Sequence, residues 1–177
     1  MSFQQQPPCL VRWGAIMSPH TPLVIGITED GAICRIAFAK GLKASVILKE
    51  WRKEWPQAVF VEDKKAAAKA AWDLSKGGGG FKLYMVGTKF QHAVWKELLK
   101  IPAGKTISYA EVARRIKNPK AVRAVGTACG ANPVPILVPC HRVIGSDGRL
   151  GGFGGGLALK QTLLKAEGIY NEAKKAA

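Results

Sequence analysis

The sequence predicts a small α/β domain over residues 1–86, followed by a mainly helical domain over residues 87–177. Apolar runs of strand length alternate with helical patterns in the first part, whereas several helix-start signals lie close together in the second. Four consecutive glycines, Gly77–Gly80, interrupt the pattern shortly before this change. A chain of 177 residues is long enough for two small domains that each bury a core.

The first domain is predicted to begin with a β-hairpin. Leu23–Thr28 and Ala32–Ala39 have the composition of strands, and the Asp30-Gly31 step between them is a strong hairpin signal. A helical pattern near Leu42–Trp55 follows. The remaining predicted elements are a short strand at Val59–Val61, an alanine-rich helix at about Lys64–Leu74 and a strand at Phe81–Val86.

The second domain is predicted to begin with a well-capped helix. Thr88 and Gln91 have the spacing of a capping box, in which each side chain bonds the other residue's backbone amide. Phe90, Val94 and Leu98 follow at intervals of four residues, which places them in one apolar stripe. The pattern therefore predicts an amphipathic helix that packs on the core of this domain.

Two short helices come next. Ser108 and Glu111 predict a second capping box, which opens a helix that continues to about Ile116. Asn118 is the predicted N-cap of the following helix, with Pro119 in its first turn. Such a pair of short capped helices is typical of a helix-turn-helix.

The second helix of this pair is predicted to have a core face and a small basic face. At about 100° per residue, the core face holds Ala121, Val122, Val125, Ala128 and Cys129. Lys120, Arg123 and Thr127 point the other way. This arrangement suits a helix that contacts DNA, and it also suits an ordinary amphipathic surface helix. Cys129 is interpreted as a packing residue.

The charge of the chain favours a polyanionic partner. Lys and Arg number 27 against 12 Asp and Glu, a net charge of +15, and residues 87–177 hold 15 of these cations against 5 acids. Nucleic acid is the first candidate partner and an anionic membrane the second; the alternative interpretation is that the charge serves solubility alone. No apolar run reaches membrane-spanning length and the N-terminus lacks a signal-peptide pattern. We expect a location in the cytoplasm, or the nucleus of a eukaryote.

The four cysteines are expected to be free thiols. They are Cys9, Cys34, Cys129 and Cys140, and no two of them form a CxxC pair. A structural zinc site is therefore not expected. Nothing in the sequence indicates secretion, so disulfides are not expected either.

Cys140 is the candidate for chemistry. It follows an apolar run, Val134–Val138, that is bracketed by prolines and predicted to be a buried extended segment. His141 comes next and offers a base, and the thiolate is the reactive form of cysteine. A cysteine at the end of a buried run is also commonly structural, and the residue pattern alone leaves both interpretations open.

A glycine-rich loop and a last helix complete the domain. The loop, Gly145–Gly156, lacks the patterns of phosphate-binding loops, so no nucleotide cofactor is expected. A helix from about Leu157 is predicted to bury Leu159, Leu163 and Ala166, with Gly168 as its cap. Glu167 at its end opposes the helix dipole, so we expect its carboxylate to have another partner.

Several motifs of the second domain occur together. They are Phe90-Gln91 with Val94-Trp95, Ile107-Ser108-Tyr109, Arg123-Ala124-Val125-Gly126, Asn132-Pro133, Pro139-Cys140-His141-Arg142-Val143, the Gly-Gly-Phe-Gly-Gly loop and Leu163-Leu164-Lys165-Ala166-Glu167-Gly168. In this order and spacing they resemble the O6-alkylguanine-DNA alkyltransferases. The resemblance is dense from Gly87 to Gly168 and weaker over residues 1–86. It implies a ribonuclease-H-like α/β domain and a C-terminal winged helix-turn-helix domain.

The resemblance also implies an activity, the irreversible transfer of an alkyl group from O6-alkylguanine in duplex DNA to the protein itself. Cys140 would be the acceptor, His141 would take its proton through a water molecule, and Glu167 would orient His141. Tyr109 would donate to the guanine ring. Asn132 would tie the helix-turn-helix to the segment that carries the cysteine. No cofactor and no metal are implied, and each molecule would react once.

The DNA contacts implied by the resemblance lie around the base pocket. Arg123 would fill the place of the flipped-out base, with Lys120 and Thr127 on the same face of a helix that enters the minor groove. Little sequence preference follows, because minor-groove and phosphate contacts carry little sequence information. The carbonyl of Val143 and the amide of Gly154 would line the pocket. The expected partner is damaged duplex DNA, bound by a monomer, with no membrane involved.

The chain departs from the family pattern at three places. Phe153 stands where many members have tyrosine, which keeps a ring in the pocket but removes a hydroxyl. Gly154 stands where some members have a side chain, which can widen the pocket for bulkier alkyl groups. The N-terminal cysteine cluster of zinc-dependent relatives is missing, since Cys9 and Cys34 are too few, so no regulatory zinc domain is expected.

Three other functions compete with this one. A non-catalytic relative that only flags the lesion would lack the acceptor cysteine. A sequence-specific regulator would need more base-reading side chains than Lys120, Arg123 and Thr127 provide. A thiol hydrolase would need an oxyanion hole, for which the sequence has no convincing motif.

Overall fold

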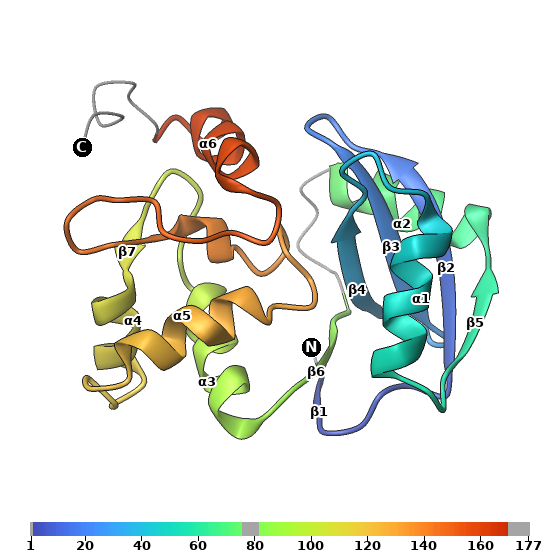
Figure 1. Cartoon of the computed structure of the whole chain (residues 1–177), viewed down its shortest axis with the longest axis horizontal. Helices are drawn as coiled ribbons and strands as arrows, with labels where there is room; N and C mark the ends of the chain where they lie inside the picture. The colour runs from blue at the N-terminus through green and yellow to red at the C-terminus, as the bar shows by residue number, and fades with distance from the viewer. Residues whose placement is uncertain (1, 76–81, 170–177) are drawn as a thin grey trace. The chain divides into compact units, whose positions relative to one another are not determined.

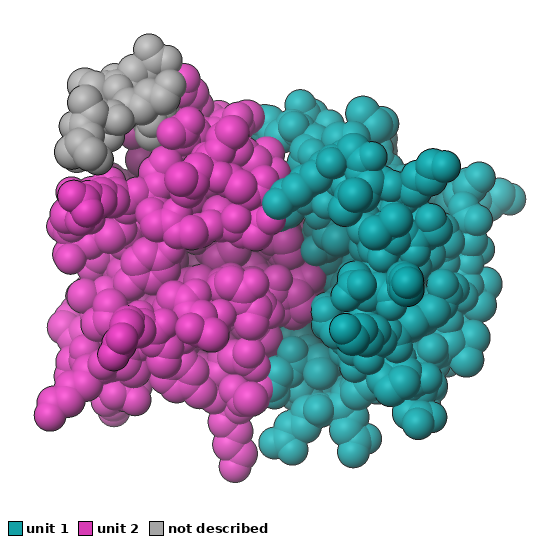
Figure 2. Space-filling model, viewed as in Figure 1, with its two compact units in different colours: residues 1–87 teal, residues 88–177 magenta. Residues whose placement is uncertain are grey.

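The protein consists of two compact units of mixed α/β content, residues 1–87 and 88–177 (Figures 1 and 2). The computed structural model describes residues 2–75 and 82–169. The division falls one residue after the predicted boundary. The glycine run Gly77–Gly80 lies outside the described residues.

The first unit is built on a four-stranded sheet in the order β4-β3-β2-β5. Its strands are β2 (Leu10–Met17), β3 (Pro22–Thr28), β4 (Ile33–Phe38) and β5 (Val59–Glu62). β2, β3 and β4 are antiparallel neighbours, and β5 runs parallel to β2. The predicted hairpin is confirmed: Gly31 has a φ of +83°, and the amide of Thr28 donates to the carbonyl of Ala32 at 2.8 Å.

The central strand β2 was not predicted, because Arg12 and Gly14 interrupt its apolar pattern. The structure gives both residues a role on the same face. A Cβ at Gly14 would lie 2.5 Å from the side chain of Ala67, so glycine is what lets a helix pack directly on the strand. Arg12 forms an ion pair with Asp63 at 3.5 Å. These partners lie about fifty residues further along the chain, where no local pattern reveals them.

Two helices cover opposite faces of this sheet (Figure 1). The helix α1 (Ala44–Glu54) buries Ile47, Leu48 and Trp51 in a cluster with Val24 of β3. The helix α2 (Lys64–Ser75) packs on the face that carries Gly14. A separate parallel pair joins β1 (Ser2–Gln4) to β6 (Tyr84–Val86), which falls within the predicted strand Phe81–Val86.

The second unit is mainly helical. Its elements are α3 (Lys89–Leu98), β7 (Ile107–Ser108), α4 (Tyr109–Arg115), α5 (Val122–Gly130), a 3₁₀ turn η1 (Cys140–Arg142), β8 (Val143–Ile144) and α6 (Leu157–Ala166). β7 and β8 form a short parallel pair. The capping box of Thr88 and Gln91 is confirmed in both directions. The indole of Trp95 donates to the carbonyl of Ala128 at 2.8 Å, which fixes α3 against α5 in the core.

The second predicted capping box forms only in one direction. The hydroxyl of Ser108 accepts from the amide of Glu111 at 3.1 Å, as expected for an N-cap. The carboxylate of Glu111 instead accepts hydrogen bonds from Arg114 and Arg115. The two arginines hold the pKa of Glu111 down, at about 2.

The predicted start of α5 is wrong by several residues. The amide of Ala121 donates to the carbonyl of Asn118 at 3.0 Å, which closes a turn over these four residues. Pro119 is the second residue of that turn, a position that its fixed φ also favours. Ala121 is the N-cap and the helix begins at Val122, so Lys120 lies before the helix.

The helix α6 buries Leu163 as predicted, but its buried face is otherwise different. Its buried residues are Lys160, Leu163 and Leu164, whereas Ala166 is exposed and Leu159 is half-buried. Gly168 is confirmed as the residue after the cap: it has a φ of +73°, and the amide of Ile169 donates to the carbonyl of Leu164 at 3.0 Å. The buried positions recur at helical spacing, and Glu167 at the C-cap continues their row.

Candidate active site

Cys140 follows a tight turn, not the extended segment predicted for Val134–Val138. The amide of Val138 donates to the carbonyl of Val134 at 3.0 Å, and Ile136 has a φ of +76°. A β-branched residue with positive φ is strained, so the surrounding contacts must hold this turn in place. Proline and apolar residues alone do not show whether a segment is extended or folded back, so the prediction of an extended segment was wrong.

Asn132 holds this turn and the cysteine together. Its side-chain carbonyl accepts from the amide of Val134 at 3.0 Å, and its side-chain amide donates to the carbonyl of Val138 at 2.8 Å. The same amide donates to Sγ of Cys140 at 3.2 Å. One side chain, two residues after the end of α5, therefore contacts both the turn and the thiol.

The Cys140 thiol is buried, with 6% of the residue exposed. Burial raises its pKa, because a thiolate loses hydration in an apolar site. The hydrogen bond from Asn132 and the positive charge of Lys160 act in the opposite direction. Burial thus disfavours the thiolate of Cys140, and Asn132 and Lys160 partly offset that effect.

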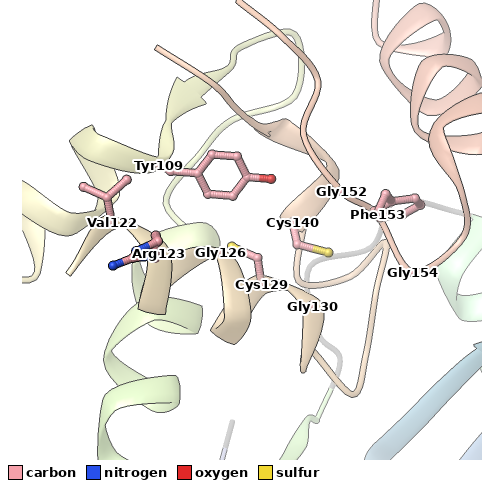
Figure 3. A pocket seen from close by; sticks show the side chains of 10 residues that line it. All are labelled: Tyr109, Val122, Arg123, Gly126, Cys129, Gly130, Cys140, Gly152, Phe153 and Gly154. Carbon is pink, nitrogen blue, oxygen red and sulfur yellow. The ribbon is translucent and has the colours of Figure 1, made fainter. Parts of the chain in front are cut away.

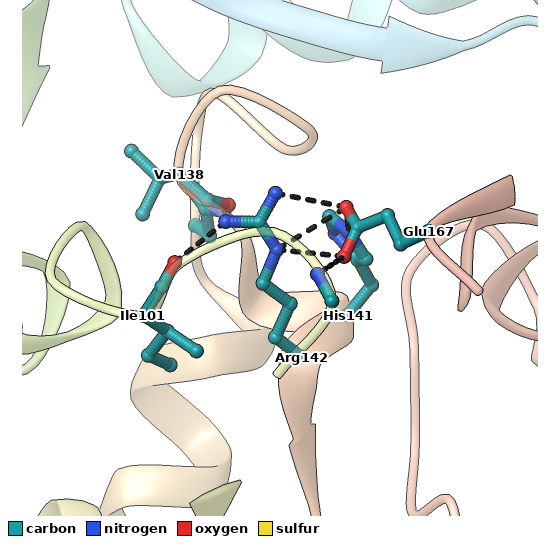
Figure 4. Close-up of polar contacts among 7 residues, drawn as sticks. Ile101, Val138, His141, Arg142 and Glu167 are labelled. Atoms are coloured by element: carbon teal, nitrogen blue, oxygen red, sulfur yellow. Dashed lines mark hydrogen bonds and ion pairs between the residues drawn. The ribbon is translucent and has the colours of Figure 1, made fainter. Parts of the chain in front are cut away.

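Behind the cysteine, His141, Arg142 and Glu167 form a charged cluster (Figure 4). Nε2 of His141 lies 2.9 Å from Oε1 of Glu167. Nε and Nη2 of Arg142 donate to the same carboxylate, at 2.9 and 2.8 Å. Nη1 of Arg142 donates to the carbonyl of Ile101 at 2.6 Å. The carboxylate expected to need a partner has two, and they come from the residues directly after Cys140.

Burial, and not the cluster, keeps the imidazole of His141 neutral. Burial lowers the pKa of His141, and it outweighs the attraction of the Glu167 carboxylate, which raises it. Burial would raise the pKa of Glu167, but the hydrogen bonds from Arg142 and His141 outweigh it, so this pKa is lowered. Within the described part of the chain, Nδ1 of His141 is buried and has no hydrogen-bond partner. A neutral imidazole with an unused nitrogen can accept a proton.

A pocket of about 440 Å³ opens above the thiol (Figure 3). It is lined by Tyr109, Val122, Arg123, Gly126, Cys129, Gly130, Cys140, Gly152, Phe153 and Gly154. These residues come from α4, α5, η1 and the glycine-rich loop. Burial raises the pKa of Tyr109 to about 12, so its phenol stays protonated and can donate a hydrogen bond into the pocket.

The glycines of the pocket serve two purposes. Gly151 has a φ of +65°, and a Cβ there would lie 2.8 Å from the hydroxyl of Tyr109, so only glycine lets the loop pass this close to the phenol. At Gly152 and Gly154 a Cβ would meet nothing within 4 Å. Their missing side chains leave room in the pocket itself.

The structure brings together most of the predicted site residues. Cys140, Tyr109, Arg123, Phe153 and Gly154 line the pocket, while Asn132, His141 and Glu167 support the cysteine from behind. The other three predicted residues do not line it. Lys120 and Thr127 are exposed, and the carbonyl of Val143 accepts a hydrogen bond from Lys160 at 2.6 Å.

Three residues were missed. Cys129 was interpreted as packing and is buried, but it also lines the pocket. Arg142 belongs to a family motif but was given no role, although a cation two residues after the cysteine is a natural partner for a carboxylate. Lys160 gave a clear signal: at i, i+3 and i+4 with Leu163 and Leu164, it occupies an apolar helix row where a lysine is unexpected.

Two properties of the described residues bear on ligands and location. Within residues 2–75 and 82–169, no three His, Cys, Asp or Glu side chains gather as a metal site would require. None of the helices in these ranges combines the length and hydrophobicity needed to cross a membrane.

Comparison with known proteins identifies the family. Residues 89–169 match the family model described as "6-O-methylguanine DNA methyltransferase, DNA binding domain". The methylated-DNA–protein-cysteine methyltransferase of Methanosarcina mazei is 46% identical over 158 residues, which span 86% of this chain and 94% of that protein. The chain belongs to the methylated-DNA–protein-cysteine methyltransferases. The inducible methyltransferase of Bacillus subtilis is 46% identical over 125 residues, which span 67% of this chain and 70% of that protein.

Solved structures of this methyltransferase family have the same fold. The O6-methylguanine methyltransferase of Mycobacterium tuberculosis is 36% identical, with a TM-score of 0.73 over 92% of this chain and 96% of its own. The structure of Mycobacterium tuberculosis OGT in complex with DNA is 35% identical, with a TM-score of 0.72 over 89% of this chain and 92% of its own. The methyltransferase family therefore accounts for both units and not only for the residues around Cys140.

Proposed function

We propose that this protein repairs O6-alkylguanine in duplex DNA by transferring the alkyl group irreversibly to its own Cys140. The observation that carries the proposal is a buried thiol at the base of a pocket, held by Asn132 and followed by a neutral histidine with a carboxylate partner. A nucleophile, a base and a group that orients the base are the parts that covalent catalysis requires. The names of the family's members support this reaction.

The chemical step needs a thiolate. His141 accepts the thiol proton through a water molecule at Nδ1, and Glu167 fixes the ring through Nε2. Sγ of Cys140 then attacks the alkyl carbon. The S–C bond forms, the bond from that carbon to O6 breaks, and guanine leaves with the electron pair. The product is a thioether, which does not reverse, so each molecule reacts once.

Tyr109 assists the leaving group. Its phenol lines the pocket, and its raised pKa keeps the proton on the oxygen at neutral pH. The phenol donates to the guanine ring as negative charge develops there, which lowers the barrier to departure. The proton given up by the thiol is balanced by the proton that the guanine gains.

The substrate base enters the pocket from outside the duplex, because a base inside the stack cannot reach a buried thiol. A pocket of about 440 Å³ is within the size range of small-molecule sites, which supports binding of a single flipped base. Gly154 and Phe153 line the base pocket, whereas the carbonyl of Val143 accepts a hydrogen bond from Lys160. Arg123, at the mouth and exposed, fills the place that the base leaves.

The DNA-binding element is a winged helix-turn-helix formed by α4 and α5 within residues 87–177, and α5 enters the minor groove. Lys120, just before α5, and Thr127, on its exposed face, contact phosphates. These contacts read little sequence. The Mycobacterium tuberculosis OGT was crystallised in complex with DNA, which supports DNA as the partner here. Residues 1–86 form a ribonuclease-H-like domain, and the protein acts as a monomer.

The proposal is tested by intact-mass measurement after mixing with a duplex that contains one O6-methylguanine. The wild-type protein gains one methylene, about 14 Da, in stoichiometric amount, because the methyl group replaces the thiol proton. Cys140→Ser gains nothing. Folded wild-type protein that binds the lesion without any gain in mass contradicts the transfer and supports a non-catalytic lesion-binding protein instead. Cys140→Ser must bind the damaged duplex as well as the wild type does, so that its failure reports on chemistry.

A further inference from the structure

Lys160 is buried in the interior of the second unit, with 0% of the residue exposed. Among the residues that the structure describes, it is the only lysine or arginine buried to this extent, and no carboxylate is among the groups that influence its pKa. An ammonium group without a counter-ion is costly to bury. Its position in the core therefore needs compensation from its neighbours.

Two backbone carbonyls provide part of that compensation. Nζ of Lys160 donates to the carbonyl of Val143 at 2.6 Å and to the carbonyl of Leu150. Val143 follows the 3₁₀ turn that carries Cys140, and Leu150 immediately precedes the glycines of the pocket. One ammonium group thus joins the cysteine segment to the glycine-rich loop that lines the pocket.

The ionisable groups that face Lys160 belong to the reaction site. Cys140 from η1 and Cys129 from α5 raise the pKa of Lys160, but burial is the larger influence and lowers it to about 8. Lys160 in turn lowers the pKa of Cys140 and of His141. The ring of Tyr109 from α4 lies 5.9 Å from Nζ. The cation is therefore coupled to the thiol, the base and the phenol.

We propose that Lys160 is a positioning residue for this reaction: its ammonium group joins the Cys140 segment to the glycine-rich loop, and its charge stabilises the thiolate of Cys140. The row of α6 that carries Lys160 also leads to Glu167 at the end of the helix. One helix face thus supplies both a cation toward the thiol and a carboxylate toward the histidine. The effect of Lys160 on alkyl transfer rests on the proposed function, whereas its effect on the thiol does not.

The test measures how fast the Cys140 peptide is carbamidomethylated by iodoacetamide at pH values from about 6 to about 10, where a thiol ionises. Peptide mass mapping separates Cys140 from the other cysteines. Lys160→Met, a neutral side chain of similar length, shifts the midpoint of this profile upward. A shift of one unit makes the thiol about tenfold less reactive at neutral pH. A Lys160→Met midpoint equal to that of the wild type overturns the proposal.

Two further variants separate the charge from the hydrogen bonds and from general effects. Lys160→Gln keeps a donor for the carbonyls but has no charge, so its midpoint rises as in Lys160→Met. A wild-type midpoint in Lys160→Gln overturns the role of the charge. Lys165→Met removes an exposed lysine of the same helix and leaves the profile unchanged. A shift equal to that of Lys160→Met in this control also overturns the proposal, because the effect would then be non-specific.

A measurement on the folded wild type covers the case in which the Lys160 variants do not fold. The ammonium and the thiolate stabilise each other, so removal of the thiolate must make Lys160 lose its proton more easily. NMR titration of the labelled lysine side chain therefore gives a lower midpoint for Lys160 in Cys140→Ser than in the wild type. Equal midpoints overturn the coupling. Neither the thiol measurement nor the lysine measurement uses DNA, so both test the role of Lys160 alone. Failure of the proposed function would appear in a different experiment, as wild-type protein that gains no methyl group by intact mass.

Discussion

The two units of this protein bury different kinds of side chain. Apart from apolar residues, the described interior of the first unit includes only Thr28, whose hydroxyl serves the adjoining hairpin turn. The second unit buries His141 and Lys160 beside the Cys140 thiol. Desolvation of such groups costs stability unless their partners are well placed. Substitutions in the first interior should therefore change stability alone, whereas substitutions in the second should change stability and reactivity together.

Each unit also contains an arginine–glutamate pair. In the first, Nη2 of Arg35 lies 2.5 Å from Glu54, a side chain that is 55% exposed. In the second, Nη2 of Arg142 lies 2.8 Å from Glu167, which is only 17% exposed. The two arginine side chains are similarly buried, at 13% and 16% exposed, so the pairs differ in the exposure of the carboxylate. Because water screens the charge of Glu54 more than that of Glu167, we expect the first pair to contribute less to stability.

The largest effect on stability is expected for Trp51→Ala in the first unit. The indole is buried in the cluster between α1 and the sheet, and its removal leaves a cavity. The loss is about 3–5 kcal/mol in the free energy of unfolding, measured by urea denaturation. Methyl transfer per folded molecule stays at the wild-type rate, because every residue that lines the pocket belongs to the second unit.

Trp72→Ala is the matched control for this substitution. Trp72 lies in the same unit but is 61% exposed, so its removal changes stability by no more than about 0.5 kcal/mol. If Trp51→Ala instead slowed transfer by folded protein as strongly as it lowered stability, the proposed separation of roles between the units would be wrong.

The next largest effect is expected for Glu167→Gln. The change leaves the half-buried guanidinium of Arg142 without a counter-charge and His141 without its carboxylate partner. We expect a loss of about 3 kcal/mol, the lower end of the range for broken buried pairs because some exposure remains. Methyl transfer at neutral pH slows by ~100-fold, since general-base catalysis is weakened. Rapid-quench measurement of transfer and urea denaturation report the two effects.

Glu54→Gln is the corresponding change in the first unit. Because the Glu54 carboxylate is exposed, although Arg35 is not, this pair contributes no more than about 1 kcal/mol, and its loss leaves transfer unchanged. Equal losses of stability in Glu54→Gln and Glu167→Gln would show that exposure does not decide the value of these pairs.

The pH dependence of stability should come mainly from the second unit. Burial lowers the pKa of His141 below its unfolded value of about 6.5, so protonation favours the unfolded chain. Its contribution is complete above pH ~6.5 and decreases as the pH falls toward the folded pKa, by about 1.4 kcal/mol for each unit between the two values. The lowered pKa of Glu167 adds a second loss below pH ~4.3.

Urea denaturation at a series of pH values tests this expectation. The decrease that begins near pH ~6.5 disappears in His141→Asn, while the loss at lower pH remains. A wild-type protein whose stability is constant between pH 6.5 and about 5, where buried neutral histidines become charged, would contradict the assignment. Methyl transfer should slow over the same interval, because a protonated imidazole cannot accept the thiol proton.

Local patterns predicted the elements whose cause is local. The hairpin at Gly31, the box at Thr88 and the cap at Gly168 were predicted because turn and cap chemistry involves residues a few positions apart. The strand β2 was missed because Gly14 is explained only by Ala67, a residue on another element. The start of α5 was misplaced because Pro119 fits a turn as well as a first helical position.

The residues of the site likewise divide into those that a local pattern reveals and those that depend on distant contacts. Cys140 and His141 are neighbours in sequence, so a thiol beside a base was visible, and Glu167 was expected to need a partner that the residues alone did not name. The burial of Lys160 could have been inferred from its spacing with Leu163 and Leu164. Its role could not, because that role depends on the carbonyls of Val143 and Leu150, which only the fold brings to one place. Family resemblance supplied roles for individual residues; the structure adds the contacts that couple them.

The smallest effects are expected at helix starts, where the first turns of α3 and α1 differ. Thr88 caps α3 with its side chain, whereas Lys43, the N-cap of α1, makes no side-chain capping bond although its backbone is extended as a cap requires. Thr88→Ala should lose about 1 kcal/mol. Lys43→Asp should gain a similar amount, ~1 kcal/mol, because it adds an acceptor and replaces a positive charge at the positive end of the helix dipole. Urea denaturation measures both, and a Lys43→Asp protein less stable than the wild type would show that the lysine has a structural role that its backbone geometry does not reveal.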